Sequence, residues 1–388
     1  IQLHQKHGTK LIYTFSTYKD GRTLIEHLQE VLLQNGIELH EIPAETVFKE
    51  IIKNENNKYF NKFILLVNQF ISNYKTNGYT EEDFDILINK ISNVRVKLFL
   101  KLIKPIYLYY QAFLSENDYT DFQDMINLST QLIKNAKKSD YKQKYKYIIV
   151  DEYQDISRQR FNLTKELADK TDAKIIAVGD DWQSIYAFAG SKINLFTKFK
   201  EEMGYADYLT INYTYRNSQE LIDIAGDFVQ KNESQLKKSL VSHKKIKKPV
   251  VIYEFDDYNL KDSSKGIKGV VAEKGKVLDD IISKIVKVEG EHAEILLLVR
   301  YNFEIKQLIQ YSHLFSEDRN GNIISWNYPK TRISLMTIHK SKGLGYDNVI
   351  LLNGSDEYFG FPSQIEMDPL LSLVIFDDKS YQYAEERR

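Results

Sequence analysis

The chain has 388 residues, enough for two or three domains, and its charged and apolar fractions are ordinary for a globular protein. Its net charge of −1 excludes a globally basic nucleic-acid binder, so any such contact must come from local patches. Because cysteine is absent, disulfides, thiolate nucleophiles and cysteine metal sites are excluded, which suits a reducing compartment. No apolar run is long enough to span a membrane, and we expect a cytoplasmic protein with no membrane partner.

The first third of the sequence predicts one strand followed by helices. Residues 10–15 have the pattern of a short strand, and residues 21–35 that of an amphipathic helix stopped by Gly36. From residue 44 to about residue 136 the apolar spacing is helical almost throughout, so we expect an all-helical domain that is largely scaffold. The helices expected within it cover residues 60–72, residues 95–113 with an interruption at Pro105, and residues 119–128.

Alternating strands and helices follow as far as residue 352. A basic connector comes first, with six lysines between residues 134 and 146 that fit either solvent exposure or contact with nucleic-acid phosphates. The expected strands cover residues 148–150, 174–178, 208–213, 250–255, 294–299, 332–338 and 348–352. The expected helices cover residues 157–169, 217–230, 272–287 and 303–312, with a linker at 236–248 and a hairpin turn at Asn320-Gly321. This alternation on both sides of the linker predicts two doubly wound α/β domains.

Acidic residues end two of the expected strands. Residues 148–150 form an apolar run that we expect to be buried on both faces of a parallel sheet. Asp151 and Glu152 then emerge at its carboxyl end, where open α/β sheets bind their ligands. Such a pair alone is more often a solvated helix start, but the run over residues 174–178 also ends in acids, within residues 179–181. Carboxylates at one sheet edge suit a magnesium ion and an activated water.

Four segments resemble, in the same order, motifs of the UvrD/Rep-like superfamily 1 DNA helicases. Residues 151–155 (DEYQD) resemble the Walker B motif, and residues 179–191 (GDDWQSIYAFAGS) the third motif in its helicase IV-like form. Residues 212–217 (NYTYRN) resemble the fourth motif, and residues 337–347 (TIHKSKGLGYD) the fifth. The resemblance covers roughly residues 120–388.

This resemblance implies an α/β fold built from RecA-like domains of the P-loop NTPase type with parallel sheets, plus an all-helical inserted domain. The implied boundaries are 1–140 for the N-terminal strand, helix and inserted domain, 141–235 for an incomplete first RecA-like domain, and 236–388 for the second, truncated in its sixth motif.

The resemblance also implies ATP and Mg²⁺ as cofactors and gives roles to single residues. Asp151 would hold the metal, and Glu152 would orient the attacking water. Gln183 would contact the γ-phosphate or that water and so sense the nucleotide state. Arg216 would stabilise the charge of the transferring phosphoryl group, and Tyr215 would stack on the base of the nucleotide. The remaining nucleotide contacts that it implies are Gly179, Asp180, Lys342 and Gly343.

Aromatic residues in the third motif indicate how a DNA strand is held. Tyr186 and Phe188 are two positions apart, so in an extended segment their rings point the same way and suit the stacking of unpaired bases. Both rings could instead belong to the core. The resemblance adds Thr337 and His339 of the fifth motif as DNA contacts, although a lone histidine is more often structural.

The sequence departs from the family pattern at several places. It contains no P-loop of the form Gly-x-x-x-x-Gly-Lys-[Ser/Thr], which the family carries upstream of Walker B. The chain starts at Ile1 without a signal peptide, and residues 385–388 resemble the opening of the sixth motif, so we expect a fragment of a longer protein. Ala189 replaces an arginine, and Gly345 a glutamate, that many relatives carry.

The function that the resemblance implies is that of an ATP-dependent DNA helicase, a hydrolase that moves 3′ to 5′ along single-stranded DNA or at its junction with duplex. Its implied partners are replication, repair or transcription proteins, and without a P-loop we expect the 388-residue chain alone to be inactive. An alternative is a module that binds DNA or a polymerase through the same fold without unwinding. A different Walker-type ATPase, such as a recombination protein, would not account for Gln183, Arg216 and His339 together.

Overall fold

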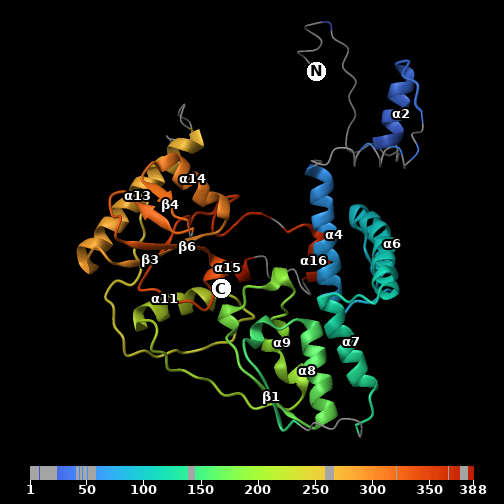
Figure 1. Cartoon of the computed structure of the whole chain (residues 1–388), viewed down its shortest axis with the longest axis horizontal. Coiled ribbons are helices and arrows are strands. Elements are labelled where there is room, and N and C mark those ends of the chain that lie inside the picture. Colours follow the sequence, from blue (N-terminus) through green and yellow to red (C-terminus); the bar gives the residue numbers. More distant parts are fainter. Residues whose placement is uncertain are drawn as a thin grey trace. The chain divides into compact units, whose positions relative to one another are not determined.

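The computed structural model (Figure 1) describes residues 8, 24–40, 43, 46, 50, 58–138, 145–257, 266–319, 321–365, 367–375 and 383–388. The chain divides into two compact units, Ile1–Leu66 and Val67–Arg388. In the first unit, α2 (Leu24–Gln34) confirms the helix expected over residues 21–35, and Gly36 follows it with a φ of 75° that favours glycine. The strand expected over residues 10–15 lies outside the described residues. In the described ranges, no helix has both the length and the apolar character needed to cross a membrane.

Helices α4 (Lys58–Thr76), α5 (Asp83–Lys90), α6 (Val94–Glu116) and α7 (Phe122–Asn135) confirm the helical character expected of this part of the sequence. Their core is aromatic. Phe70, Tyr74 and Phe84 are fully buried, and the ring centroids of Tyr74 and Phe84 are 4.4 Å apart. Because aromatic rings bury large apolar areas, a few of them suffice to hold these helices together.

Helix α6 is continuous, so the interruption expected at Pro105 is wrong. A proline inside a helix removes one backbone hydrogen bond and costs about 3 kcal/mol. The buried residues of α6 lie on both sides of the proline, with Val96 and Leu100 before it and Tyr107 after it. Burial along the whole helix therefore offsets the cost and keeps its two halves in one element.

A buried ion cluster joins α4 to α7. Lys75 is 1% exposed, and its Nζ donates to Asp121 Oδ2 at 2.5 Å and to Asp124 Oδ2 at 2.6 Å. Asp121 also caps α7 by accepting from the Asp124 amide at 2.7 Å, and it accepts from the Tyr110 hydroxyl at 3.0 Å. Since a buried charge is costly unless it is paired and hydrogen-bonded, these contacts fix the start of α7 against α4.

Strands β1 (Tyr147–Val150) and β2 (Lys174–Ala177) run parallel with Val150 beside Ala177, which confirms the expected pair of neighbouring strands. Val150 and Ala177 pack on a core that includes Tyr153 of the short 3-10 helix η2 (Tyr153–Asp155) and Phe161 of α8 (Arg158–Thr171). One face of the strand pair is thus covered by the chain that directly follows β1.

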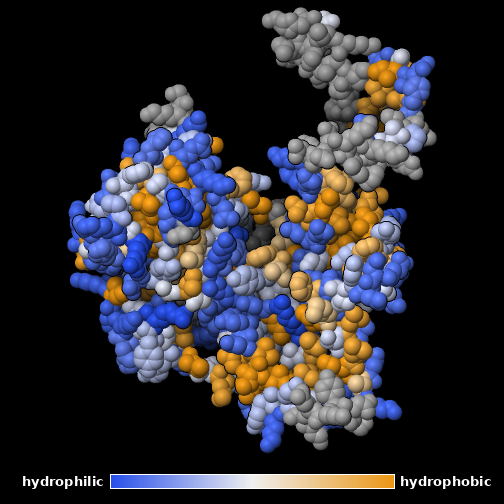
Figure 2. Space-filling model, in the orientation of Figure 1, coloured by the Kyte–Doolittle hydropathy of each residue, from blue (hydrophilic) through white to orange (hydrophobic). Residues whose placement is uncertain are grey.

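The prediction that residues 148–150 are buried on both faces is wrong. Ile149 is 68% exposed and Ile176 of the neighbouring strand is 43% exposed. In the described part of the chain this sheet has two strands, and successive side chains alternate between its covered and its open face. Figure 2 shows apolar surface over the region of β1.

A second sheet has five strands in the order β4-β5-β6-β3-β7. Strand β3 (Glu294–Val299) lies between β6 (Arg332–Thr337) and β7 (Asn348–Leu351) and runs parallel to both, which confirms all three as strands. Strands β4 (Phe315–Glu317) and β5 (Ile323–Ser325) form an antiparallel hairpin at one edge, with Gly321 in its turn at a φ of 82°. Asn320 of the expected turn lies outside the described residues.

Two long helices follow the expected positions and cover this sheet. Helix α13 (Gly266–Glu289) and helix α14 (Asn302–Ser312) supply Leu278, Ile282 and Leu308 to the core. The buried strand residues that meet them are Ile295, Leu297, Phe315, Ile323 and Ile333. The near-continuous apolar run of β3 is explained by its place inside the sheet, between two parallel neighbours, since such strands are buried on both faces.

Two further strand predictions are wrong, those over residues 208–213 and 250–255. Both segments lack regular structure, and Leu209, Ile211 and Ile252 are 95%, 85% and 79% exposed. Apolar β-branched residues form a strand only where a neighbour supplies backbone partners. Here the described residues give the first segment only an isolated bridge between Tyr213 and Val241.

Short elements complete the described chain. They are η3 (Asp181–Gln183), η4 (Ala187–Ala189), α9 (Asn194–Thr197), α10 (Phe199–Met203), α11 (Gln219–Val229), α15 (Ile338–Ser341), α16 (Pro369–Ile375) and α17 (Ala384–Arg387). Helix α11 confirms the helix expected over residues 217–230, and the Ser218 hydroxyl caps it by accepting from the Leu221 amide.

Candidate nucleotide and nucleic-acid site

Hydrogen bonds link the ends of β1 and β2. The side chain of the buried Gln154 donates to Glu152 Oε2 at 2.5 Å and accepts from the Asp180 amide at 2.9 Å. Asp180 Oδ2 in turn accepts from Gln183 Nε2 at 2.8 Å. A Cβ atom on Gly179 would lie 2.4 Å from Gln154 Oε1, so only glycine fits beside this amide. Sequence reasoning missed Gln154, although its place two residues after Glu152 marked it for this edge.

Asp151 is the acid best suited to a metal. It is exposed just beyond β1, and its Oδ1 accepts from the Glu152 amide at 2.8 Å. Magnesium is usually bound by one or two carboxylates together with waters and phosphate oxygens. The Asp151 carboxylate therefore fits this ion.

Asp180 and Asp181 are engaged by a lysine from the expected linker. Lys238 Nζ donates to Asp180 Oδ1 at 2.5 Å and pairs with the fully buried Asp181. Although burial opposes ionisation of Asp180, its hydrogen bonds with Lys238 and Gln183 hold its pKa below the usual value. Lys238 also lies 5.4 Å from the centre of the Trp182 ring. Sequence reasoning missed Lys238 because a basic run gives no sign of which lysine is half-buried and paired.

Arg216 and Tyr215 lie on the exposed segment before α11. Tyr215 is 74% exposed, and the Arg216 carbonyl accepts from Lys244 Nζ at 3.3 Å. In the described part of the chain, the hydrogen bonds that join Glu152 to Gln183 do not reach the Arg216 guanidinium. The structure thus connects Glu152 and Asp180 to the side-chain amide of Gln183 through hydrogen bonds. The role of Arg216 stays a prediction.

Tyr186, Phe188 and His339 come together. The Tyr186 hydroxyl donates to the His339 carbonyl at 2.9 Å, and the Phe188 and His339 ring centroids are 5.0 Å apart at 86°. Phe188 is 45% exposed, so the cluster is open to a ligand. The extended conformation expected for this segment is wrong, since η4 follows Tyr186 and Gly190 turns the chain at a φ of 91°.

The fifth motif continues β6 at its carboxyl end. Thr337 is the last residue of β6 and precedes α15, which carries His339. Lys342 donates to Asp155 Oδ2 and lies 4.9 Å from the centre of the Tyr186 ring. Lys342 is thus engaged by Asp155, whereas Gly343 is exposed. The nucleotide contacts predicted for these two residues stay predictions.

Arg300 was missed by sequence reasoning. It directly follows β3, and its Nη1 lies 3.3 Å from His339 Nδ1 while its Nη2 donates to Glu386 Oε1 at 2.8 Å. Burial, reinforced by the Arg300 charge, lowers the pKa of His339. The neighbouring Glu385 accepts from the Ala187 amide at 2.9 Å. Arg300 follows a parallel strand, as Asp151 does, and this position was the signal that could have identified Arg300.

Two models of known protein domains match this chain, one in its N-terminal half and one in its C-terminal part. Residues 3–204 match the UvrD/REP helicase N-terminal domain, and residues 276–388 match the UvrD-like helicase C-terminal domain. DNA helicase IV of Escherichia coli (strain K12) is 30% identical over 290 residues, which cover 74% of this chain and 37% of that protein. ATP-dependent DNA helicase Rep of Buchnera aphidicola is 30% identical over 220 residues, covering 55% of this chain and 32% of Rep.

ATP-dependent DNA helicase PcrA of Staphylococcus epidermidis is also 30% identical, over 200 residues that cover 50% of this chain and 26% of PcrA. The chain thus spans between 26% and 37% of the length of these relatives. The two matched domains imply a RecA-like α/β fold for the parts that contain the two sheets. With one domain model matching more than half of its residues and a second matching its carboxyl-terminal part, the chain belongs to the UvrD/Rep helicase family.

Proposed function

We propose that this chain is part of an ATP-dependent DNA helicase and holds one DNA strand between its two α/β parts. The observation that carries the proposal is the meeting of Tyr186 and Phe188, which follow β2, with His339, which follows β6. Residues from two sheets form one partly exposed aromatic surface. Unpaired bases stack on surfaces of this kind, with about 1–3 kcal/mol per base and little dependence on sequence.

The nucleotide half of the proposal rests on the loops after β1 and β2. Asp151 would hold Mg²⁺ and Glu152 would orient the attacking water, as in the family. When bound, magnesium neutralises part of the charge of the triphosphate. The chain itself holds Gln183 on Asp180, only three residues before Tyr186. A change of nucleotide state at Gln183 would therefore shift the aromatic surface.

Contacts between the two α/β parts would transmit that shift. Lys342, after β6, pairs with Asp155, after β1. Helix α17 touches both parts, because Glu385 accepts from the Ala187 amide and Glu386 accepts from Arg300. These polar contacts can break and re-form as the two parts open and close, which would release and regrip the bases.

The remaining features of the proposal follow the family resemblance. They are movement 3′ to 5′ on single-stranded DNA or at its junction with duplex, a cytoplasmic site of action, and replication, repair or transcription partners. Arg216 would stabilise the transferring phosphoryl group and Tyr215 would stack on the nucleotide base. Domain boundaries near residues 140 and 235 belong to the same proposal.

Fluorescence anisotropy with labelled single-stranded DNA tests the proposal. Phe188→Ala should weaken binding roughly 5- to 150-fold, the factor that corresponds to one stacked base. Tyr109→Ala is the matched control, because Tyr109 is 76% exposed on α6 and belongs to another surface. Equal affinity of the two variants, or no preference of the chain for single-stranded over duplex DNA, would refute the proposal.

A further inference from the structure

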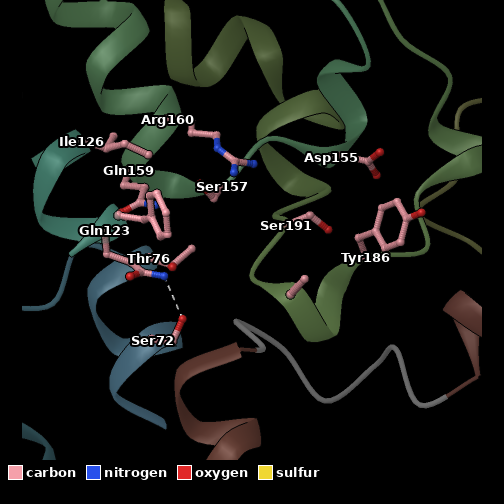
Figure 3. A pocket seen from close by; sticks show the side chains of 12 residues that line it. Ser72, Thr76, Gln123, Ile126, Asp155, Ser157, Gln159, Arg160, Tyr186 and Ser191 are labelled. Carbon is pink, nitrogen blue, oxygen red and sulfur yellow. Dashed lines mark hydrogen bonds between the residues drawn. The ribbon is translucent and has the colours of Figure 1, made fainter. Parts of the chain in front are cut away.

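The loop that carries Tyr186 and Phe188 supports a further inference. This loop, residues 184–191, contains η4 and is closed by the Ser191 amide, which donates to the Tyr186 carbonyl at 3.2 Å. One side of the loop borders a pocket of about 270 Å³, and Figure 3 shows Tyr186 and Ser191 at this pocket. Because protein interiors are closely packed, the pocket leaves the loop without full packing on that side. Contacts elsewhere on the loop must therefore fix its shape.

Glu385 of α17 supplies a cap that the loop itself lacks. The first turn of a helix leaves backbone N–H groups without partners, and a side chain at the N-cap position usually accepts from one of them. Tyr186, at the N-cap position of η4, makes no such bond. Instead, Glu385 Oε1 accepts from the Ala187 amide at 2.9 Å, from 198 positions further along the chain. This contact fixes the start of η4.

Arg388 holds the beginning of the same loop. Its Nη1 donates to the Ser184 carbonyl at 3.3 Å, and its Nε donates to Gln235 Oε1 at 2.9 Å. Gln235 is 6% exposed and donates in turn to the fully buried Asp181. These hydrogen bonds tie the loop to side chains that are themselves fixed by burial. Glu385 and Arg388 thus hold the loop at two points.

These two points determine where the aromatic rings lie. Tyr186 lies between them, and its hydroxyl donates to the His339 carbonyl at 2.9 Å. Phe188 directly follows the capped Ala187, and its ring centroid is 5.0 Å from that of His339. A change of the backbone at either point would therefore shift the rings on which a base stacks.

We propose that Glu385 and Arg388 are positioning residues for DNA binding, because they hold the loop in the shape that brings Phe188 beside His339. This inference rests on the proposed function. Both residues contact the loop at backbone amide or carbonyl groups, so they act through the aromatic side chains that the loop carries. The contacts of α17 with the loop thereby set the geometry of the DNA site.

The test measures affinity and stacking separately, with the 388-residue chain and single-stranded DNA that carries a fluorescent base analogue sensitive to stacking. Glu385→Ala should weaken binding about 2- to 10-fold, the factor of one net hydrogen bond. At saturating protein, it should also shift the fluorescence of the bound DNA toward the value found with Phe188→Ala. Glu385→Gln keeps an acceptor oxygen and should match the wild type in both measurements. Glu233→Ala is the matched control, because Glu233 is exposed and carries the same charge.

A double-mutant cycle shows whether these residues act through the loop. When Phe188→Ala has already removed the ring, adding Glu385→Ala should weaken binding by a smaller factor than it does in the wild type. Arg388→Met is a second variant and should behave in the same way. Thermal unfolding gives the folded fraction to which each affinity is referred, and the fluorescence at saturation does not depend on that fraction.

Two results would overturn the inference and leave the stacking surface intact. One is wild-type affinity and fluorescence in both Glu385→Ala and Arg388→Met. The other is a loss of affinity that is equal with and without the Phe188 ring, since this would mean that the two residues act elsewhere. Failure of the wild type to bind single-stranded DNA would refute the proposed function, and this inference with it.

Discussion

Removing the Lys342 ammonium group should weaken the contact between the two α/β parts. The side chains of Lys342 and Asp155 are 11% and 19% exposed, so Lys342→Met leaves a largely buried carboxylate without its partner. Breaking a buried ion pair in this way costs about 3–5 kcal/mol, and we expect about 3 kcal/mol because both side chains keep some contact with solvent. Burial already raises the pKa of Asp155 against the opposing effect of Lys342, and in the variant it should rise further.

A double-mutant cycle in urea measures this coupling. Lys342→Met/Asp155→Asn should recover much of the stability lost in Lys342→Met, because no unpaired charge remains buried. Lys340→Met is the matched control, since Lys340 is exposed two residues earlier on α15. A loss below about 0.5 kcal/mol in Lys342→Met, no larger than that of the control, would show that solvent screens the pair and that it does not join the two parts.

Three further predictions concern hydrolysis, pH dependence and the helical part. The 388-residue chain should hydrolyse little ATP in a phosphate-release assay, and brisk magnesium-dependent hydrolysis that disappears in Glu152→Gln would contradict this. The pKa of His339 is lowered from 6.5, so the neutral ring should make its full contribution to stability above pH 6.5. This contribution should be lost as the pH falls from 6.5 through the lowered pKa, and urea unfolding of His339→Gln should show no such dependence. Lys75→Met should destabilise the chain by about 3–5 kcal/mol in the same assay, with recovery when Asp121 and Asp124 are also changed to Asn, and no loss would mean that the cluster is solvated.

The central elements of the fold were predictable from local pattern. The runs over residues 148–150, 174–178 and 294–299 are short, apolar and bounded by polar residues, and each coincides with a parallel strand. The runs over residues 208–213 and 250–255 have the same local pattern, yet they are not strands. A pattern shows that a segment can pair, whereas pairing depends on a neighbour that local sequence does not reveal.

The candidate site was predictable only in part for a similar reason. Residue type and the end of a strand placed Asp151, Glu152 and the Gly179-Asp180 pair at one sheet edge, where Gln154 links Glu152 to Asp180, while their roles stay predictions. No spacing rule brings Phe188 to His339, 151 positions further along the chain, so their contact was not predicted, and the sequence indicated each of them only as a DNA contact. Lys238 was missed because its importance comes from long-range partners, whereas Arg300 has such a partner too but could have been identified by its place after a strand.

The most direct test of the account is to locate the DNA on the protein. Single-stranded DNA that carries a photoreactive base should crosslink to Tyr186, Phe188 or His339, the residues at which the two α/β parts meet. Peptide mapping by mass spectrometry identifies the attached residue. Crosslinks confined to aromatic residues elsewhere, such as Trp326 with its 65% exposure, would contradict a DNA site between the two parts.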